Sequence, residues 1–284
     1  MLFRSVIGST LAAQRPSDPA LLVPETAPAL DYVPVANPVT LPAGTTMGAT
    51  AAVAFDAKGH LFVLARGGTS FFEFDPAGTF VRSFGEPMTR AHGLRIDRDG
   101  NLWATDVGAH TVMKYNMKGE LLLTIGVKGQ AGAWDEAAGE RKLNQPNDIA
   151  IADNGDIFVV QGHTPGPMGD PRVLKFDKDG KFIKSWGGKG NAPGQFVVAH
   201  GIVIDSKGLP CSVVFGRDEA FMVNGFAGQL LRLDLTGKVL AATGKPGTAP
   251  GEFGEAHFIA LSPRGDVYIA DSVNGQLMKF VRKK

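Results

Sequence analysis

Three of the six histidines in the chain occur in the same sequence frame. They are His92 in AHGLRID, His200 in AHGIVID and His257 in AHFIALS, each at the start of an apolar stretch. Three neutral imidazoles with an open fourth position make a catalytic zinc site rather than a closed structural one. Two plainer readings remain open: each histidine is a hydrogen-bonding loop residue, or duplicated units have inherited the same residue.

A repeat of short strands is the element that would position these histidines. Four phrases share an alternating apolar stretch, a tight turn and a second apolar stretch: AAVAFDAKGHLFVLA, HGLRIDRDGNLWATD, NDIAIADNGDIFVVQ and HFIALSPRGDVYIAD. Their turns contain Gly59, Gly100, Gly155 and Gly265, as expected where φ is positive. Successive turns lie roughly 40–60 residues apart, which is the length of a four-stranded propeller blade. The sequence therefore predicts an all-β fold, a β-propeller.

The first strand of each blade lies nearest the central axis of a propeller, so the residue at its entry faces the channel. In this chain we expect those entry positions to hold Thr50, His92, Asn147, His200 and His257. Imidazoles from three separate blades would then point toward one spot on the axis. A damaged unit after the second of these histidines would place all three on alternate blades of six.

Five units are legible, and one stretch breaks the pattern. Leu209–Gln229 stands where a second apolar strand is expected, so either a sixth unit is compressed there or most of one blade is missing. The last unit stops after its third strand. We expect the β-prone Tyr32–Gly44 to supply its outer strand and close the ring. The prediction is a single propeller domain over 31–284, preceded by a signal-like or disordered segment, 1–30.

The composition excludes several kinds of partner. A formal charge of +1 over 284 residues gives no electrostatic basis for binding nucleic acid. No apolar run approaches the roughly 20 residues needed to span a bilayer. The single cysteine, Cys211, excludes an internal disulfide and a cysteine-based zinc site. The first residues, MLFRSVIGSTLAAQ, resemble a short export signal, which favours the periplasm or secretion and leaves the cytoplasm open. We expect a monomer.

Several phrases carry a resemblance to a known family. They include LARGGTSFFEFD, RAHGLRIDRDGNLWATDVGAHTVMKY, RVLKFDKDGKFIKSWGGKGNAPGQF and VYIADSVNGQLMKF. These phrases resemble NHL-repeat propellers and, more narrowly, are similar to the peptidyl-α-hydroxyglycine α-amidating lyases. The resemblance covers roughly Tyr32 to Lys284. It implies a six-bladed propeller with zinc on its axis, bound by the three histidines described above.

The resemblance also implies roles for further residues. The family's arginine after the second strand of an early blade matches Arg66 in LARGG. A calcium ion in the family uses a backbone carbonyl at the position of Leu94. The family's catalytic tyrosine lies in a D-G-Y phrase, which reads Gln161-Gly162-His163 here. Among the residues of this chain, His163 is the candidate to act in its place as the base.

Two more positions depart from the family pattern. A second arginine of the family belongs to an A-D-R-x-N-G-R phrase that has no counterpart in Leu209–Gln229, where Arg217 is a weak substitute. The acidic calcium ligand that follows the third histidine is replaced by Phe258. The resemblance therefore keeps the zinc triad and leaves the calcium site incomplete.

Three functions are compatible with these observations. The first is a zinc-dependent lyase that cleaves peptidyl-α-hydroxyglycine, or a related carbinolamide, into an amide and glyoxylate. The second is a non-catalytic interaction propeller that binds a protein partner. The third is a metal-dependent hydrolase such as a lactonase. Sites of that kind rely on carboxylate and amide ligands, for which Asn147 and Asp148 are candidates.

Overall fold

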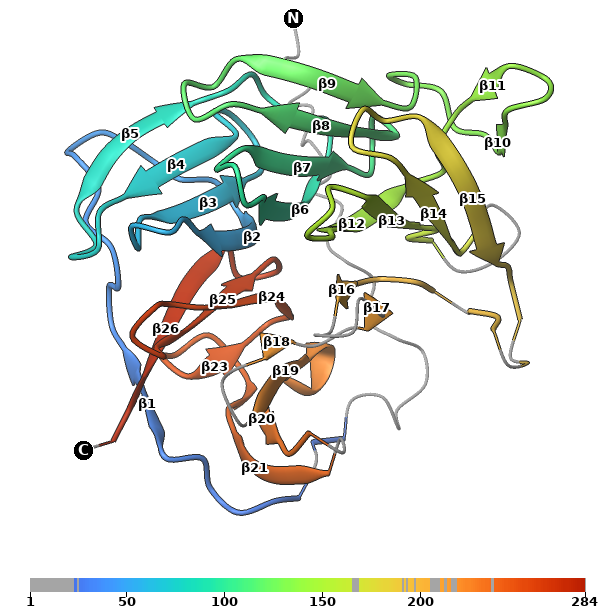
Figure 1. The fold of residues 1–284 in the computed structure, drawn as a ribbon. Coiled ribbons are helices and arrows are strands. Elements are labelled where there is room, and N and C mark those ends of the chain that lie inside the picture. The colour runs from blue at the N-terminus through green and yellow to red at the C-terminus, as the bar shows by residue number, and fades with distance from the viewer. Residues whose placement is uncertain are drawn as a thin grey trace, which may run out of the picture.

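The chain forms a ring of small antiparallel sheets around a central channel (Figure 1). The computed structural model describes residues 23–24, 26–164, 169–190, 192, 194–196, 198–204, 210–211, 214–215, 219–235 and 238–283. The signal-like stretch MLFRSVIGSTLAAQ, within the predicted segment 1–30, and the candidate Arg217 lie outside these described residues.

Five four-stranded sheets are present among the described residues, as the repeat predicted. The first three are β2–β5 (Thr50–Phe55, Leu61–Ala65, Phe71–Phe74, Phe80–Phe84), β6–β9 (Ala91–Ile96, Leu102–Asp106, Thr111–Tyr115, Leu121–Ile125) and β12–β15 (Pro146–Ile151, Ile157–Gln161, Arg172–Phe176, Phe182–Gly187). The others are β18–β21 (Val214–Phe215, Ala220–Asn224, Gln229–Leu233, Val239–Thr243) and β24–β26 (Ala256–Leu261, Val267–Asp271, Gln276–Arg282) with β1 (Tyr32–Val35).

A two-stranded sheet lies between the third and fourth of these blades in chain order. It consists of β16 (Val203–Ile204) and β17 (Pro210–Cys211). The irregular stretch Leu209–Gln229 is therefore not a single degenerate blade. Its described parts supply β17 of this partial blade together with β18 and β19 of the next. The prediction of five legible units and one unit that is compressed or partly missing is confirmed.

The outer edge of the last blade is completed by the front of the chain, as predicted. Strand β1 pairs antiparallel with β26, with Tyr32 opposite Arg282. Just before β1, Leu30 donates its N–H to the carbonyl of Ala242 at 2.9 Å, on the outer strand of the preceding blade. The N-terminal segment thus pairs with two neighbouring blades and leaves β26 without a free edge.

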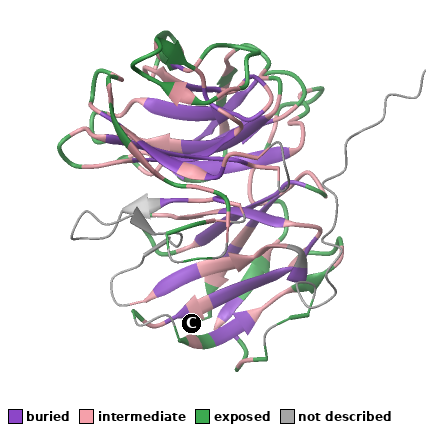
Figure 2. Cartoon of the chain, turned by 90° about the vertical axis from the view of Figure 1, so that its right-hand side faces the viewer, coloured by how far each residue is buried: buried purple, intermediate pink, exposed green. Residues whose placement is uncertain are grey.

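Burial decreases outward within a blade (Figure 2). The second strands β3, β7, β13 and β25 are buried at every residue, because each is packed between neighbouring sheets. The outer strand β5 alternates half-buried and exposed residues. The tight turns adopt the conformation that the sequence predicted, with φ of 83° at Gly59 and 84° at Gly100. The described helical segment is too short to cross a membrane.

Four inner strands share an irregularity at the channel mouth. The register of β2, β6, β12 and β24 shifts at or next to the second residue of the strand. This bulge corrects the predicted alignment of the first blade. The residue equivalent to His92 is Ala51, not Thr50, whose hydroxyl instead donates to the carbonyl of Gln276 at 2.6 Å.

Two short pieces connect blades, and a third joins two strands within one blade. The hairpin β10–β11 (Trp134–Asp135 and Glu140–Arg141) follows the second blade. A parallel pair, β22–β23 (Lys245–Pro246 and Glu252–Phe253), follows β21. A 3-10 turn, η2 (Gly225–Ala227), joins β19 to β20. The inner strands β6 and β24 carry His92 and His257, so these strands set the geometry of the site.

Candidate metal centre

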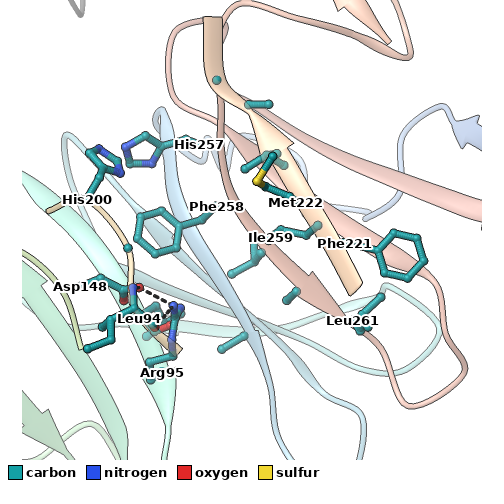
Figure 3. Close-up of a pocket in the computed structure, with 18 of the residues that line it drawn as sticks. Leu94, Arg95, Asp148, His200, Phe221, Met222, His257, Phe258, Ile259 and Leu261 are labelled. Atoms are coloured by element: carbon teal, nitrogen blue, oxygen red, sulfur yellow. Dashed lines mark hydrogen bonds and ion pairs between the residues drawn. The ribbon is translucent and has the colours of Figure 1, made fainter. Parts of the chain in front are cut away.

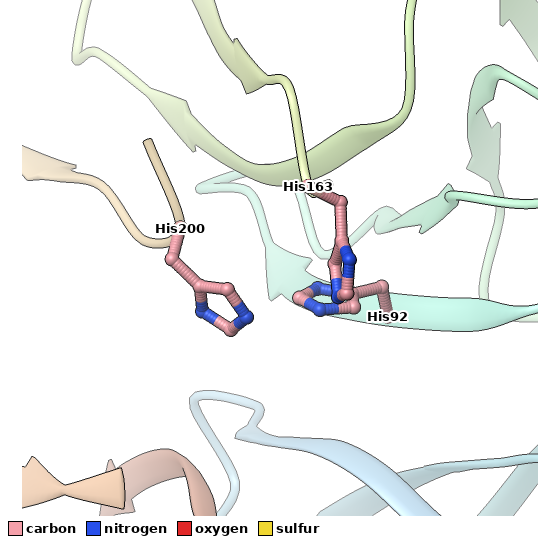
Figure 4. Close-up of side chains that lie close together, drawn as sticks. All are labelled: His92, His163 and His200. Atoms are coloured by element: carbon pink, nitrogen blue, oxygen red, sulfur yellow. The ribbon is translucent and has the colours of Figure 1, made fainter. Parts of the chain in front are cut away.

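Four imidazoles converge where the inner strands begin. The ring centroid of His92 lies 4.5 Å from that of His257, 4.7 Å from His200 and 4.8 Å from His163. His200 and His257 are 5.2 Å apart. The fold therefore brings together the three histidines of the repeated frame. His163 joins them from the loop that follows β13, and Figure 4 shows it with His92 and His200.

Backbone carbonyls of neighbouring blades hold two of these rings. Nδ1 of His92 lies 2.8 Å from the carbonyl oxygen of Asn147, and Nδ1 of His257 lies 2.8 Å from that of Ala51. A carbonyl oxygen only accepts, so Nδ1 is the protonated nitrogen of both rings. In the neutral form, Nε2 of each ring then carries a bare lone pair.

These two bare nitrogens face each other. Nε2 of His92 and Nε2 of His257 are 3.1 Å apart, and neither has a proton to share while Nδ1 donates to a carbonyl. Two lone pairs at this distance repel each other unless a cation lies beside both. Tetrahedral zinc, with Zn–N bonds of about 2.0–2.1 Å, separates its nitrogen ligands by about 3.3 Å. The pair fits a shared metal ion to within a few tenths of an ångström.

The surroundings keep the imidazoles neutral. Burial lowers the pKa of His92 and of His257 well below the usual range, and neighbouring histidines lower both further. Burial, then Arg66 and Arg90, lowers the pKa of His200 to about 4. Neutral imidazole is the form that binds metal, so at neutral pH the rings are ready to act as ligands.

The loop histidine is also within reach of a shared ion. The candidate ligand nitrogens of His92, His163 and His200 all lie within 4.8 Å of one another, so this set could hold a metal ion. Burial, followed by His200 and two arginines, lowers the pKa of His163 to about 3. Its position makes it either a fourth nitrogen donor or a group adjacent to the open position of a three-histidine site.

Close packing explains the glycine in the frame of the first histidine. A Cβ on Gly93 would lie 2.7 Å from the carbonyl oxygen of Asn147. That oxygen also accepts from the hydroxyl of Thr105 at 2.8 Å, and the hydroxyl in turn accepts the N–H of Gly93 at 2.7 Å. The backbone of β6 can approach β12 this closely only without a side chain at this position, and the approach fixes the ring of His92.

Two arginines and a carboxyl surround the histidines. Arg66 donates from Nε to the carbonyl of Ala91 at 2.9 Å, so its guanidinium lies beside the peptide that precedes His92. Burial and the charge of Arg90 lower the pKa of Arg66 to about 10, which leaves it a cation at neutral pH. Burial raises the pKa of Glu255, whose carboxylate accepts from the hydroxyl of Ser272.

Sequence reasoning missed Arg90 and Glu255. A signal for them exists: each stands two residues before a histidine of the repeated frame, in RAH and EAH. Both groups act on the histidine centre. Beyond the effect of burial, the charge of Arg90 helps to lower the pKa of His200. Glu255 lines the same cavity as His200 and His257.

The site implied for calcium does not fit a metal ion. The carbonyl of Leu94 accepts from Nη1 of Arg95 at 2.9 Å, and the carboxylate of Asp148 pairs with the same guanidinium. Asn147, the other candidate for a lactonase-like site, donates from Nδ2 to the carbonyl of Ala199 at 2.6 Å. The carbonyl of Leu94 and the carboxylate of Asp148 therefore already have protein partners. Among the described residues, Oδ1 of Asn147 is buried and has no hydrogen-bond partner.

A cavity of about 640 Å³ adjoins the histidines (Figure 3). His200, His257 and Glu255 line one part of it, and Met222 and Ile259 contribute to an apolar part. The channel therefore has room for a small molecule next to the candidate metal centre.

Comparison with known proteins points to amidating enzymes. The chain is 36% identical over 124 residues to a probable peptidyl-α-hydroxyglycine α-amidating lyase of Caenorhabditis elegans, covering 42% of this chain and 33% of that protein. It is 32% identical over 203 residues to peptidyl-glycine α-amidating monooxygenase B of Xenopus laevis, covering 66% and 21%. NHL repeat-containing protein 3 of Mus musculus is 28% identical over 171 residues, covering 57% and 48%. The matches thus span less than half of each relative.

Solved structures support the fold alone. A streptogramin B lyase aligns with a TM-score of 0.56 at 16% identity, covering 88% of this chain and 97% of that one. A gluconolactonase of Xanthomonas campestris aligns with a TM-score of 0.51 at 14% identity, covering 91% and 98%. No known family profile matches the sequence. The chain is a β-propeller that resembles NHL-repeat proteins and amidating lyases.

Proposed function

We propose that this chain is a zinc-dependent lyase that cleaves peptidyl-α-hydroxyglycine, or a related carbinolamide, into a primary amide and glyoxylate. The observation that carries the proposal is the pair of bare Nε2 atoms of His92 and His257, 3.1 Å apart. Three nitrogen donors with room for substrate suit a catalytic zinc ion. We assign those donors to His92, His200 and His257. The similarity to amidating lyases supplies the reaction type.

In this reaction the C–N bond of the carbinolamide breaks. The nitrogen takes up a proton and leaves as the primary amide. The hydroxyl group loses its proton, and the carbon that carries it becomes the aldehyde carbon of glyoxylate. When bound, zinc would supply Lewis-acid stabilisation of negative charge on substrate oxygen. We assign Arg66 to the substrate carboxylate, because a planar guanidinium matches two oxygens.

We assign the proton acceptor to His163. Its ring stands 4.8 Å from that of His92 and 5.5 Å from that of His200, so a substrate oxygen held between those rings would lie beside it. Burial is the main cause of its lowered pKa, and the charges of His200, Arg90 and Arg66 lower it further. A substrate carboxylate paired with these arginines would offset their charge and make the imidazole a better base.

Two other functions remain as outcomes of the experiment. An interaction propeller would bind a protein partner without chemistry, as the similarity to NHL repeat-containing protein 3 allows. A lactonase would use the oxygens of Asn147 and Asp148, but the carboxylate of Asp148 is paired with Arg95, which leaves only Oδ1 of Asn147 unpaired on these two side chains. The histidine cluster favours the lyase over both.

Zinc content and glyoxylate release test the proposal together. We expect the purified protein to hold a single zinc ion and to release glyoxylate from an N-acyl-α-hydroxyglycine. His92→Ala should lose both properties, because it removes a ligand anchored to Asn147. The control is His60→Ala, since His60 pairs with Glu73 in the first blade. Full zinc occupancy in His92→Ala would remove His92 from the site, and zinc without glyoxylate release would exclude the lyase reaction.

We also propose that the protein acts outside the cytoplasm, as a monomer. The basis for export is the signal-like beginning of the sequence, MLFRSVIGSTLAAQ. Cell fractionation of the full chain carrying a C-terminal tag would test the first point. Light scattering of the purified protein would test the second. Recovery only with cytoplasmic markers, or a dimer mass, would contradict them.

A further inference from the structure

A largely buried arginine occupies the channel beside the histidine centre. Arg95, from β6, donates from Nη1 to the carbonyl of Leu94 at 2.9 Å and from Nη2 to the carbonyl of Ile202 at 3.3 Å. Its Nη2 also forms an ion pair with Asp148 (Figure 3). Two carbonyls and a carboxylate are the oxygen ligands that a calcium ion takes in proteins. In this chain a guanidinium lies among them.

The carboxylate of Asp148 is stabilised by the groups that pair with it. Asp148, on β12, is fully buried. Its oxygens accept the N–H groups of Ile149 at 2.8 Å and Ile202 at 3.1 Å in addition to the guanidinium. Burial raises its pKa to about 6, against the opposing effect of Arg95. A buried carboxylate without a cation is strongly destabilising, so Asp148 requires a cation beside it.

An aromatic ring also packs against the guanidinium of Arg95. Phe258, on β24, is 6% exposed, and its ring centroid lies 5.4 Å from the guanidinium carbon of Arg95. An aromatic face stabilises a guanidinium and offers no oxygen to a metal ion. A divalent ion placed here would also be repelled by the arginine. The groups that surround Arg95 therefore suit the arginine and do not suit calcium.

The same pair holds the segment that carries a predicted zinc ligand. Ile202 donates its N–H to Asp148 and accepts from Arg95 at its carbonyl, so both of its backbone groups are fixed. It lies two residues after His200. Among the described residues, the blade of His200 contains only the short pair β16–β17, which gives it little other support.

We propose that Arg95 is the fixed internal cation of the channel, in place of a bound calcium ion, and that Arg95 and Asp148 position His200. The second half of this inference rests on the zinc site proposed above. The first half stands without it. The propeller then needs no calcium, and its axial cation cannot be removed by a chelator.

Calcium dependence tests the first half. Thermal unfolding of the wild-type protein should give the same Tm in excess CaCl2 and in EGTA. In the double variant Arg95→Ser/Phe258→Asp, which removes the guanidinium and adds a carboxylate, CaCl2 should raise Tm. A calcium-dependent rise in the wild type would overturn the inference. So would a double variant that folds and does not respond to calcium.

Another arginine offers a matched control. Arg82, on β5, pairs from Nε with the buried carboxylate of Glu73 at 2.6 Å and donates to the carbonyl of Met117 in the next blade. Its guanidinium carbon lies 4.6 Å from the ring centroid of Phe84. Arg82 thus repeats the chemistry of Arg95 away from the histidines, so Arg82→Met should cost stability without affecting the metal centre.

Zinc affinity, measured by competition with a chelating dye, tests the second half. Arg95→Met should weaken zinc binding by about 10–100-fold, the usual effect of losing a group that orients a ligand. Arg82→Met should bind zinc as the wild type does, and Arg95→Lys should recover part of the loss. Wild-type affinity in Arg95→Met, or an equal loss in both methionine variants, would overturn the positioning role.

The outcomes remain separable from those of the proposed function. If Arg95→Met does not fold, Arg95→Lys and the calcium titration of the wild type still decide the inference. If the wild-type protein binds no zinc, the proposed function and the positioning role fail together, while the calcium experiment still decides whether Arg95 is the internal cation.

Discussion

At the scale of residues, the protonation of the histidines is set by groups outside their own blades. His92 is anchored by a carbonyl of β12 and His257 by a carbonyl of β2, so each ring is oriented by the next sheet around the axis. The A-H frame in the sequence therefore places each histidine but does not orient its ring. The bulge of the following blade orients the ring, because it turns the carbonyl of its second residue toward Nδ1.

The role of His163 can be separated from that of a ligand. If it is the base, His163→Ala should keep its zinc and lose turnover by about 10²–10⁴-fold, the usual contribution of acid–base catalysis. Because the resemblance to amidating lyases implies a tyrosine at this position, His163→Tyr should recover part of the rate. Zinc content and glyoxylate release measure the two properties separately, with His60→Ala as the control. A loss of zinc in His163→Ala would make it a fourth ligand instead.

At the scale of elements, the N-terminal strand β1 is the piece whose contacts lie farthest away in sequence. Tyr32 is 5% exposed, packs edge-on against Phe221 with centroids 5.6 Å apart, and donates its hydroxyl to the carbonyl of Gly265 at 3.3 Å. Asp31 pairs with Arg232 and Arg282 at 2.9 Å each. One short segment thus holds the last two blades together at their rims.

The strength of this closure can be measured on one side chain. Tyr32→Ala should lower the free energy of unfolding by about 3–5 kcal/mol, as for other buried aromatic side chains. Val33→Ala is the matched control, because Val33 is 39% exposed on the same strand and should change stability little. Urea unfolding of both variants measures the difference. Equal effects of the two substitutions would show that the closure does not depend on the packing of Tyr32.

At the scale of the whole molecule, a cluster of buried neutral histidines makes stability depend on pH. In the folded protein the pKa of His92 and of His257 lies well below the usual value because both are buried. In the unfolded chain the same side chains titrate near their ordinary pKa of about 6.5. Protons therefore bind to the unfolded state first as the pH falls.

The metal-free protein should accordingly lose stability in acid. Above about pH 6.5 these histidines are neutral in both states and do not change the free energy of unfolding. Below that pH the free energy of unfolding falls, by about 2 kcal/mol per buried histidine at pH 5. Urea unfolding in the presence of a chelator at neutral and acidic pH measures this loss. The variant His92→Leu/His257→Leu should show a flatter dependence. An unchanged slope in that variant would assign the acid sensitivity to other groups.

Much of the architecture could be predicted because its signals lie in short segments of the sequence. The Gly turns and apolar phrases recur once per blade, so the propeller, the compressed unit and the closing strand all follow from repetition. The contacts of Arg95 with Asp148 and Ile202 could not be predicted, because they join different blades. The bulge that aligns Ala51, rather than Thr50, with His92 is likewise visible only once β2 and β3 are paired.

The anchoring of His257 by Ala51 has a consequence for how the chain matures. The bond spans 206 positions of sequence and joins the final sheet to the initial one. The facing nitrogens of His92 and His257 can therefore form a pair only after residue 257 has been synthesised and the first and last sheets have met. A chain truncated before residue 257 would keep His92, His163 and His200 and would lack this pair.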